Sequence, residues 1–180
     1  LKPGGELFFS DVFSDRRVPE ELKSDPVLHG ECLAGAMYRE DFRRLLAKVG
    51  CNDARIVTSR PLAIDDPVIE NLIGMIPFHA ETVRAFKLPT LEDRCEDFGQ
   101  VATYLGTIPE SPHAFDLDEH HRFLTGKPML VSGNTAEMIS QTRYRHHFDV
   151  RGDRSVHFGL FDCEPTVESS SPASSGSGCC

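Results

Sequence analysis

Two side chains near the start of the chain have types and positions suited to chemistry, the carboxylate of Asp11 and the thiol of Cys32. Asp11 follows a short apolar run, and ligands bind outside the carboxyl ends of strands in open α/β sheets. Cys32 lies in the stretch GECLAGAMY, where little else is reactive. We therefore expect a strand end to deliver Asp11 to a cleft, with the thiol beside it. Two alternatives stay open, that Asp11 only caps the next turn and that Cys32 is a small buried hydrophobic residue.

The chain has six widely spread cysteines and no CxxC pair: Cys32, Cys51, Cys95, Cys163, Cys179 and Cys180. This spacing argues against a zinc ribbon or finger. No basic, apolar signal peptide opens the chain, so we expect free thiols in a reducing, cytoplasmic compartment. Cys51 follows a glycine suited to ending a helix and is expected in a turn or core, and Cys163 is expected to be structural or incidental.

Two other groups of polar residues are expected to be solvated surface. The pairs His120-His121 and His146-His147 suggest a metal site, but adjacent residues on a helix or strand point in different directions. The acidic residues Glu92, Asp93, Glu96 and Asp97 fit an exposed face.

The elements that would position the reactive residues follow from the hydrophobic pattern. Pro3-Gly4-Gly5 breaks a helix, and the apolar run at residues 7–13 predicts a strand covered on both faces, as in a parallel sheet. Residues 54–64 and 77–88 predict two more strands, with a short helix from Asp66-Pro67 to about Gly74 between them. An amphipathic helix is predicted at residues 39–50, with an apolar stripe made of Phe42, Leu45, Leu46 and Val49. Residues 1–88 thus predict the closing portion of a doubly wound α/β domain with an edge hairpin.

The rest of the chain predicts a small α+β unit. Strands are expected at residues 100–108, 127–133, 147–152 and 155–162, and a capping box from Asn134 to Glu137 predicts a helix that continues to Phe148. Residues 164–178 are rich in serine, glycine and proline and are expected to be disordered. We predict three parts, residues 1–65, 66–163 and 164–180.

Composition limits the classes of partner. The 180 residues are 39% hydrophobic and carry a formal net charge of −9 without a dense basic stripe, which argues against nucleic acid. No apolar run is long enough to cross a bilayer. The first residues, LKPGG, look like the interior of a domain, so we expect a fragment of a longer protein.

These motifs resemble a known family. LKPGGELFFSDVF followed by GECLAGAMYREDFRRLLAKVGC is similar to the arsenite S-adenosylmethionine methyltransferases, and EDFGQVATYLGTI and NTAEMISQTRYRHHF are similar to their algal members. The terminal Cys-Cys is common there too, and the resemblance covers residues 1 to about 161. It implies the C-terminal part of a Rossmann-like class I methyltransferase sheet, followed by a small α+β arsenic-binding domain. The family's glycine-rich cofactor loop and one of its cysteines would lie upstream, so the chain alone would be inactive and its cofactor-binding residues are unassigned.

The resemblance also implies a function and its ligands. Arsenite or methylarsenite would be methylated with S-adenosylmethionine while cysteine thiolates, the preferred ligands of a soft metalloid, bind the arsenic. Cys32 matches the arsenic-binding cysteine, and Glu81 stands where a second one is expected, which would favour methylarsenite because it needs only two thiolates. Cys95 is the remaining candidate, as arsenic ligand or redox partner, and Cys179-Cys180 could capture arsenic or relay disulfides if the tail has a catalytic duty at all. The expected partner is a thiol reductant such as thioredoxin or glutathione, and the expected state is a cytoplasmic monomer.

Two other functions remain as alternatives. One is a thiol-based module that binds or sequesters arsenic without catalysis. The other is a methyltransferase for a small organic acceptor, and Cys32 in its GEC context argues against it because such acceptors need no thiolate ligands.

Overall fold

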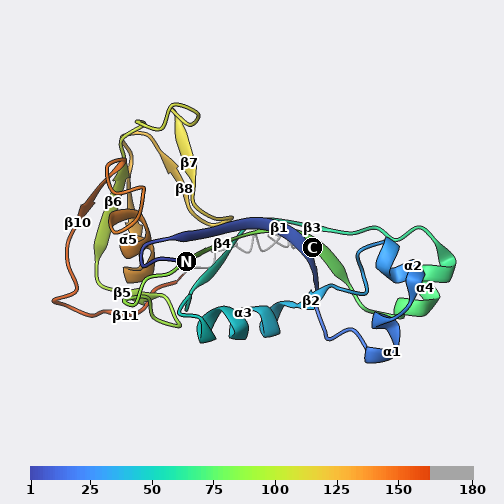
Figure 1. Ribbon diagram of the computed structural model, residues 1–180. Coiled ribbons are helices and arrows are strands. Elements are labelled where there is room, and N and C mark those ends of the chain that lie inside the picture. Colours follow the sequence, from blue (N-terminus) through green and yellow to red (C-terminus); the bar gives the residue numbers. More distant parts are fainter. Residues whose placement is uncertain (163–180) are drawn as a thin grey trace, which may run out of the picture.

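The computed structural model describes residues 1–162. Three parts follow one another along the molecule, as Figure 1 shows: a C-terminal unit of short strands at one end, a central sheet, and a lobe of short helices at the other end. In the described part of the chain, no helix is both long and apolar enough to span a membrane.

The central sheet has the strand order β2-β1-β4-β3. Its strands are β1 (Glu6–Ser14), β2 (Met37–Tyr38), β3 (Ala54–Pro61) and β4 (Phe78–Phe86). β4 runs antiparallel to both β1 and β3, and the two residues of β2 pair in parallel with the end of β1. The predicted strands are confirmed. The predicted boundary between residues 65 and 66 falls between two strands of this one sheet.

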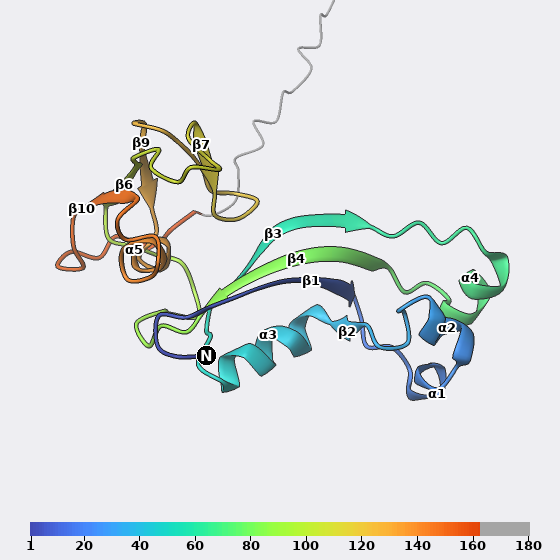
Figure 2. The ribbon, with the colours of Figure 1, turned by 45° about the horizontal axis from the view of Figure 1, so that its top comes forward.

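Helix α3 (Arg39–Lys48) covers one face of the sheet, as Figure 2 shows. The Phe42 ring packs against Phe9 and Phe13, with ring centroids 5.7 and 5.0 Å apart. Leu46 is buried with Ala85, but two members of the predicted stripe, Leu45 and Val49, are 47% and 53% exposed. The sheet therefore covers only part of the predicted stripe.

The expectation that β1 is covered on both faces is wrong for the residues that the structure describes. Phe8, on the face away from α3, is 52% exposed and carries the Arg84 guanidinium 4.9 Å from its ring centroid. α3 covers only the opposite face, so the apolar run is open at Phe8, and Val12 packs against the buried residues of the helical lobe.

The helical lobe consists of α1 (Glu20–Lys23), α2 (Pro26–Gly30) and α4 (Pro67–Ile73). The Asp25 and Asp66 side chains accept hydrogen bonds from the first backbone N–H groups of α2 and α4, each ahead of a proline suited to the first helical position. α4 begins and ends where the sequence predicts. The lobe has a core of its own, made of Val18, Leu28, Leu33, Ala34, Ala36, Ile69, Ile73, Ile76 and Phe78.

The C-terminal unit is built on a three-stranded antiparallel sheet with β6 (Gln100–Tyr104) between β9 (Pro128–Val131) and β10 (Phe148–Arg151). Two smaller pairs complete it: β5 (Glu96–Asp97) with β11 (Gly159–Leu160), and β7 (Ala114–Asp116) with β8 (Arg122–Leu124). Three of the predicted strands are confirmed, and of the fourth, predicted at residues 155–162, only Gly159–Leu160 forms a strand. The β7–β8 hairpin was not predicted because each strand has only three residues.

Helix α5 (Gly133–Ser140) differs from its prediction at both ends. Its N-cap is Ser132, whose side chain accepts from the Thr135 N–H, so the predicted cap at Asn134 is wrong. Asn134 is fully buried, and its side-chain amide instead bridges the Glu92 backbone and the Asp53 carboxylate. The helix ends at Ser140 rather than at Phe148, which is the first residue of β10.

Candidate functional site

Cys32 lies in the helical lobe, in the bend that directly follows α2. Cys32 is exposed. Its φ is +61°, and in the described part of the chain no other non-glycine residue has a positive φ. The Cys32 N–H donates to the His29 carbonyl at 3.1 Å. A left-handed backbone conformation at a residue with a side chain is uncommon and costs free energy, so the backbone at Cys32 is strained.

The bend around Cys32 has a packing cause. Leu28 before it and Leu33 and Ala34 after it are all buried in the lobe core, and both later residues donate their N–H groups to the Leu28 carbonyl. The chain must reverse within a few residues to bury both sides, and Cys32 takes the turn. Its neighbours Glu31 and Leu33 line a pocket of about 230 Å³.

The prediction for Asp11 is wrong. β1 continues past Asp11 to Ser14, and Asp11 is an exposed residue within the strand whose register partner is Glu81. The carboxylate that follows the strand end is Asp15, which contacts Arg39 at 3.1 Å and His79 at 3.4 Å.

Glu81, expected in place of a second arsenic ligand, is 3% exposed and already engaged. Its carboxylate forms an ion pair with Arg39 and accepts a hydrogen bond from Ser59 at 3.1 Å. A carboxylate is also a hard ligand, unsuited to soft trivalent arsenic. The Glu81 carboxylate is therefore bound by Arg39 and Ser59 and is not free to act as a ligand.

Cys95 lies immediately before β5, at the opposite end of the molecule from α2 and the bend that holds Cys32 (Figure 1). The structure does not bring the two thiols together. The Cys95 sulfur is partly buried and 3.6 Å from an Arg55 amino group, and its carbonyl accepts from the Phe161 N–H at 2.8 Å.

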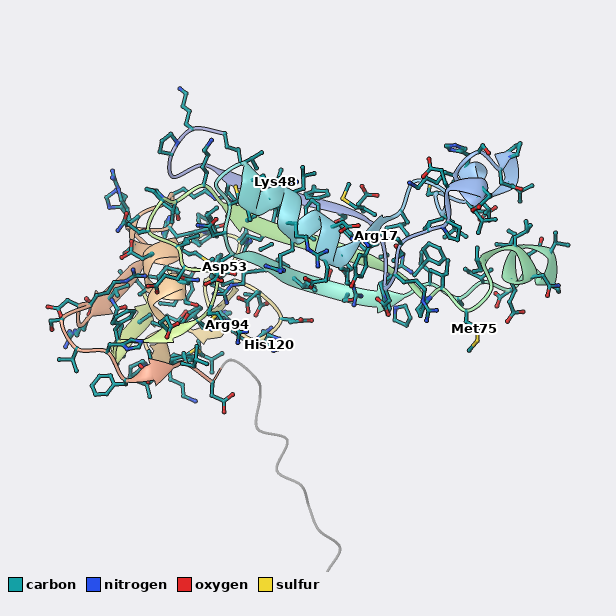
Figure 3. The ribbon with its side chains drawn as sticks, turned by 90° about the horizontal axis from the view of Figure 1, so that it is seen from below. Arg17, Lys48, Asp53, Met75, Arg94 and His120 are labelled. Atoms are coloured by element: carbon teal, nitrogen blue, oxygen red, sulfur yellow. The ribbon has the colours of Figure 1, made fainter. Side chains whose placement is uncertain are left out.

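Arg55 is the centre of a buried network that sequence reasoning missed. Its guanidinium donates to Asp53 at 2.7 Å through two nitrogens, to Asp118 at 3.0 Å, and to Thr135 at 3.3 Å. Burial opposes the charge of Arg55, but the adjacent carboxylates more than offset it and the pKa is raised. Figure 3 shows Asp53, Arg94 and His120 gathered at this end of the sheet, away from Arg17 and Met75.

The network continues into the loop between β7 and β8. The Asp118 carboxylate accepts from the His120 and His121 backbone N–H groups and lies 2.7 Å from His121 Nδ1. His121 is 5% exposed, so its predicted place on a solvated surface is wrong. Asp118, His121 and Thr135 follow one another as in an acid–base relay, with 3.5 Å between His121 Nε2 and Thr135 Oγ1. All three residues are buried.

The network predicts a pH dependence of stability. Burial alone would raise the pKa of Asp118, but the hydrogen bond and charge of His121, together with Arg55, lower that pKa to about 2. An unfolded aspartate titrates near pH ~3.9. The stabilisation is therefore fully present above about pH 4 and lost as the pH falls from about 4 to 2, by roughly 2–3 kcal/mol.

This dependence is measured as the free energy of unfolding in urea at a series of pH values. Asp118→Asn should be less stable at neutral pH and should show a shallower decline between about pH 4 and 2. An identical decline in the variant and the parent chain would contradict the assignment.

The other cysteines and the predicted acidic face complete the set of candidate residues. Cys51 is buried with Leu46 and Ala85, as predicted, and burial raises the pKa of its thiol. Cys163, Cys179 and Cys180 lie outside the described residues. Of the predicted acidic face, Glu96 pairs with His157 at 3.0 Å and Glu92 is 3.8 Å from Arg154. Within residues 1–162, no three His, Cys, Asp or Glu residues are grouped to hold a metal ion.

Comparison with known proteins agrees with this description. Residues 98–180 match the model of the arsenite methyltransferase C-terminal domain. An arsenite methyltransferase of Aquipseudomonas alcaligenes is 50% identical over 90% of this chain and 47% of its own length. The arsenite methyltransferase of Mus musculus is 35% identical over 82% of this chain and 39% of its own length. That of Homo sapiens is 34% identical over 84% of this chain and 40% of its own length.

A crystal structure of an arsenic(III) S-adenosylmethionine methyltransferase from Chlamydomonas reinhardtii superposes with a TM-score of 0.84. The two sequences are 53% identical, and the superposed region covers 90% of this chain and 54% of the algal one. The predicted fold class is confirmed: the C-terminal part of a class I methyltransferase sheet followed by a small α+β unit. The chain spans about half the length of the bacterial relative and two fifths of the mammalian ones.

Proposed function

We propose that this chain belongs to the arsenite methyltransferase family and that it works in the methylation of trivalent arsenic, with S-adenosylmethionine as methyl donor. The observation that carries the proposal is the exposed Cys32 thiol, presented by a strained bend in a chain 53% identical to an arsenic(III) methyltransferase. The surrounding buried leucines hold the bend in place, so the thiol is preorganised for a ligand.

Cys32 would bind arsenic by thiol exchange. An arsenic compound with three small-thiol ligands gives up one of them, which leaves as a free thiol, and forms one sulfur–arsenic bond to Cys32. The remaining sulfur ligands would be small thiols such as glutathione or the cysteines outside the described residues. Because Cys95 lies at the far end of the molecule, we assign it a redox or structural role in preference to a role as a second arsenic ligand beside Cys32.

We assign no residue of this chain to S-adenosylmethionine. The cofactor's usual glycine-rich loop joins a strand to a helix, and residues 1–162 contain no G-x-G-x-x-G sequence. When bound, the cofactor supplies an electrophilic methyl group. The part of the chain described here would hold arsenic and fix its position, since alignment of reacting atoms is a large share of such catalysis.

Methylation formally oxidises arsenic by two electrons, and a pair of thiols returns it to the trivalent state by forming a disulfide. A thiol reductant such as thioredoxin or glutathione would reopen that disulfide. We further propose that the protein acts as a monomer in the cytoplasm. The free state of Cys32, Cys51 and Cys95 fits a reducing compartment.

The test uses the full-length protein with methyl-labelled S-adenosylmethionine, glutathione, and either arsenite or methylarsenite. We expect labelled methylated arsenic, separated by chromatography and identified by mass spectrometry, and none without the protein. Tight arsenic binding without any labelled product would instead support the sequestering module.

A further inference from the structure

The helical lobe joins the sheet through a narrow neck, where four chain segments pass from one to the other. Two backbone hydrogen bonds join neighbouring segments there, from the Asp15 N–H to the Pro77 carbonyl at 3.1 Å and from the Leu62 N–H to the Phe78 carbonyl at 2.9 Å. Figure 2 shows β1, β3 and β4 leading into the lobe at one end of the sheet. The lobe core takes in Phe78 of β4 and packs against Val12 of β1, so the angle of the lobe to the sheet depends on the residues around this neck.

A network of charged side chains ties the neck together. Arg39, the first residue of α3 and seven residues after Cys32, reaches both Asp15 at 3.1 Å and Glu81. The Asp15 carboxylate also lies 3.4 Å from Nδ1 of His79. The Ser59 hydroxyl donates a hydrogen bond to the Glu81 carboxylate at 3.1 Å. The network therefore joins the end of β1, the start of α3, β3 and β4.

One carboxylate of this network, that of Glu81, is buried. Glu81 is 3% exposed, whereas the ion pairs elsewhere on α3, such as Arg43 with Glu40, are about half exposed. A buried carboxylate that loses its cation is strongly destabilised, so Glu81 holds Arg39 in one geometry. A surface pair imposes little constraint.

We propose that Arg39 and Glu81 are positioning residues that set the angle of the Cys32 lobe against the sheet. The inference rests on the proposed function: the sheet belongs to the methyl-donor domain and Cys32 holds the arsenic, so the neck fixes the distance between the two reactants. A displacement of about 1 Å is enough to lower a rate about a hundredfold. Binding of arsenic to Cys32 needs only the lobe and should be independent of the neck.

The experiment compares kcat and KM for methylarsenite in the full-length protein and in Glu81→Ala, Glu81→Gln and the neutral double variant Arg39→Gln with Glu81→Gln. We expect Glu81→Ala and the double variant to lower kcat by about tenfold or more with KM and arsenic binding within about twofold. Glu81→Gln keeps an acceptor for Arg39 and should recover part of the loss. Arg43→Gln is the matched control, because Arg43 pairs on the surface of the same helix and should leave both parameters unchanged.

Two kinetic outcomes would overturn the proposal: an unchanged kcat in Glu81→Ala, or a loss of arsenic binding in proportion to activity. Amide hydrogen exchange at Asp15 and Leu62 provides a readout that does not depend on methylation. We expect faster exchange at both amides in Glu81→Ala, and protection equal to the parent protein would contradict a positioning role. If the parent protein forms no methylated arsenic, the proposed function fails, while this exchange result still decides whether the network holds the neck.

Discussion

Replacing Cys32 by serine is expected to weaken methylarsenite binding by at least about a hundredfold. Trivalent arsenic prefers thiolate sulfur, and a serine hydroxyl is a hard ligand that stays protonated at neutral pH. The exposed position of Cys32 means that the fold should tolerate the change. Binding is measured by titrating the reduced chain with methylarsenite and with arsenite and following both complexes by mass spectrometry.

Cys95→Ser is the informative comparison. Since the structure places Cys95 at the other end of the molecule, binding at Cys32 should persist in this variant with an affinity within about twofold. If Cys95→Ser abolishes binding as completely as Cys32→Ser, the two thiols act together and the chain must rearrange. If binding survives the loss of Cys32, the assignment of the bend is wrong, and Cys179-Cys180 become the candidates for a sequestering site.

Replacing Arg55 by methionine is expected to destabilise the chain by about 3–5 kcal/mol. The change leaves Asp53 and Asp118 without the buried cation that neutralises both, and the Asp118 carboxylate is nearly inaccessible to water. The free energy of unfolding in urea at pH 7 measures the loss. Arg60→Met, at the exposed end of the same strand, is the matched control and should change stability by less than about 0.5 kcal/mol.

The same experiment tests how the C-terminal unit is attached. Arg55 and Arg84 are register partners on β3 and β4, and both reach the segment between β7 and β8. Arg84 donates to the carbonyls of Asp116 and Leu117, and the Glu119 N–H donates to the Ile56 carbonyl at 2.9 Å. A single cooperative transition that moves to lower urea in Arg55→Met would support one stability unit. Separation into two transitions, with the sheet unaffected, would show that Arg55 stabilises only the attachment.

The sequence by itself determined the elements whose signals are local. Asp66-Pro67 and Gly74 bound α4 because a side-chain cap, a fixed proline φ and a left-handed glycine each act within one turn of chain. The strands around β4 and β6 and the amphipathic α3 follow from periodicity, since alternation and the helical repeat depend on neighbouring residues alone. The motif around Cys32 also carried the resemblance to the arsenite methyltransferases, because it is a contiguous string.

Only the tertiary structure decided which distant groups meet. The sequence offered Asp11 beside Cys32 and Cys95 as a second ligand, whereas the fold leaves Asp11 exposed within β1 and puts Cys95 beside Arg55. The Arg55 network and the Arg39–Glu81 pair join residues from segments far apart in the chain, and no local pattern encodes such partners. His121 shows the physical reason: its partner Asp118 lies three residues away, but the Asp118 carboxylate is bound in turn by Arg55 of β3, and only packing brings that segment there.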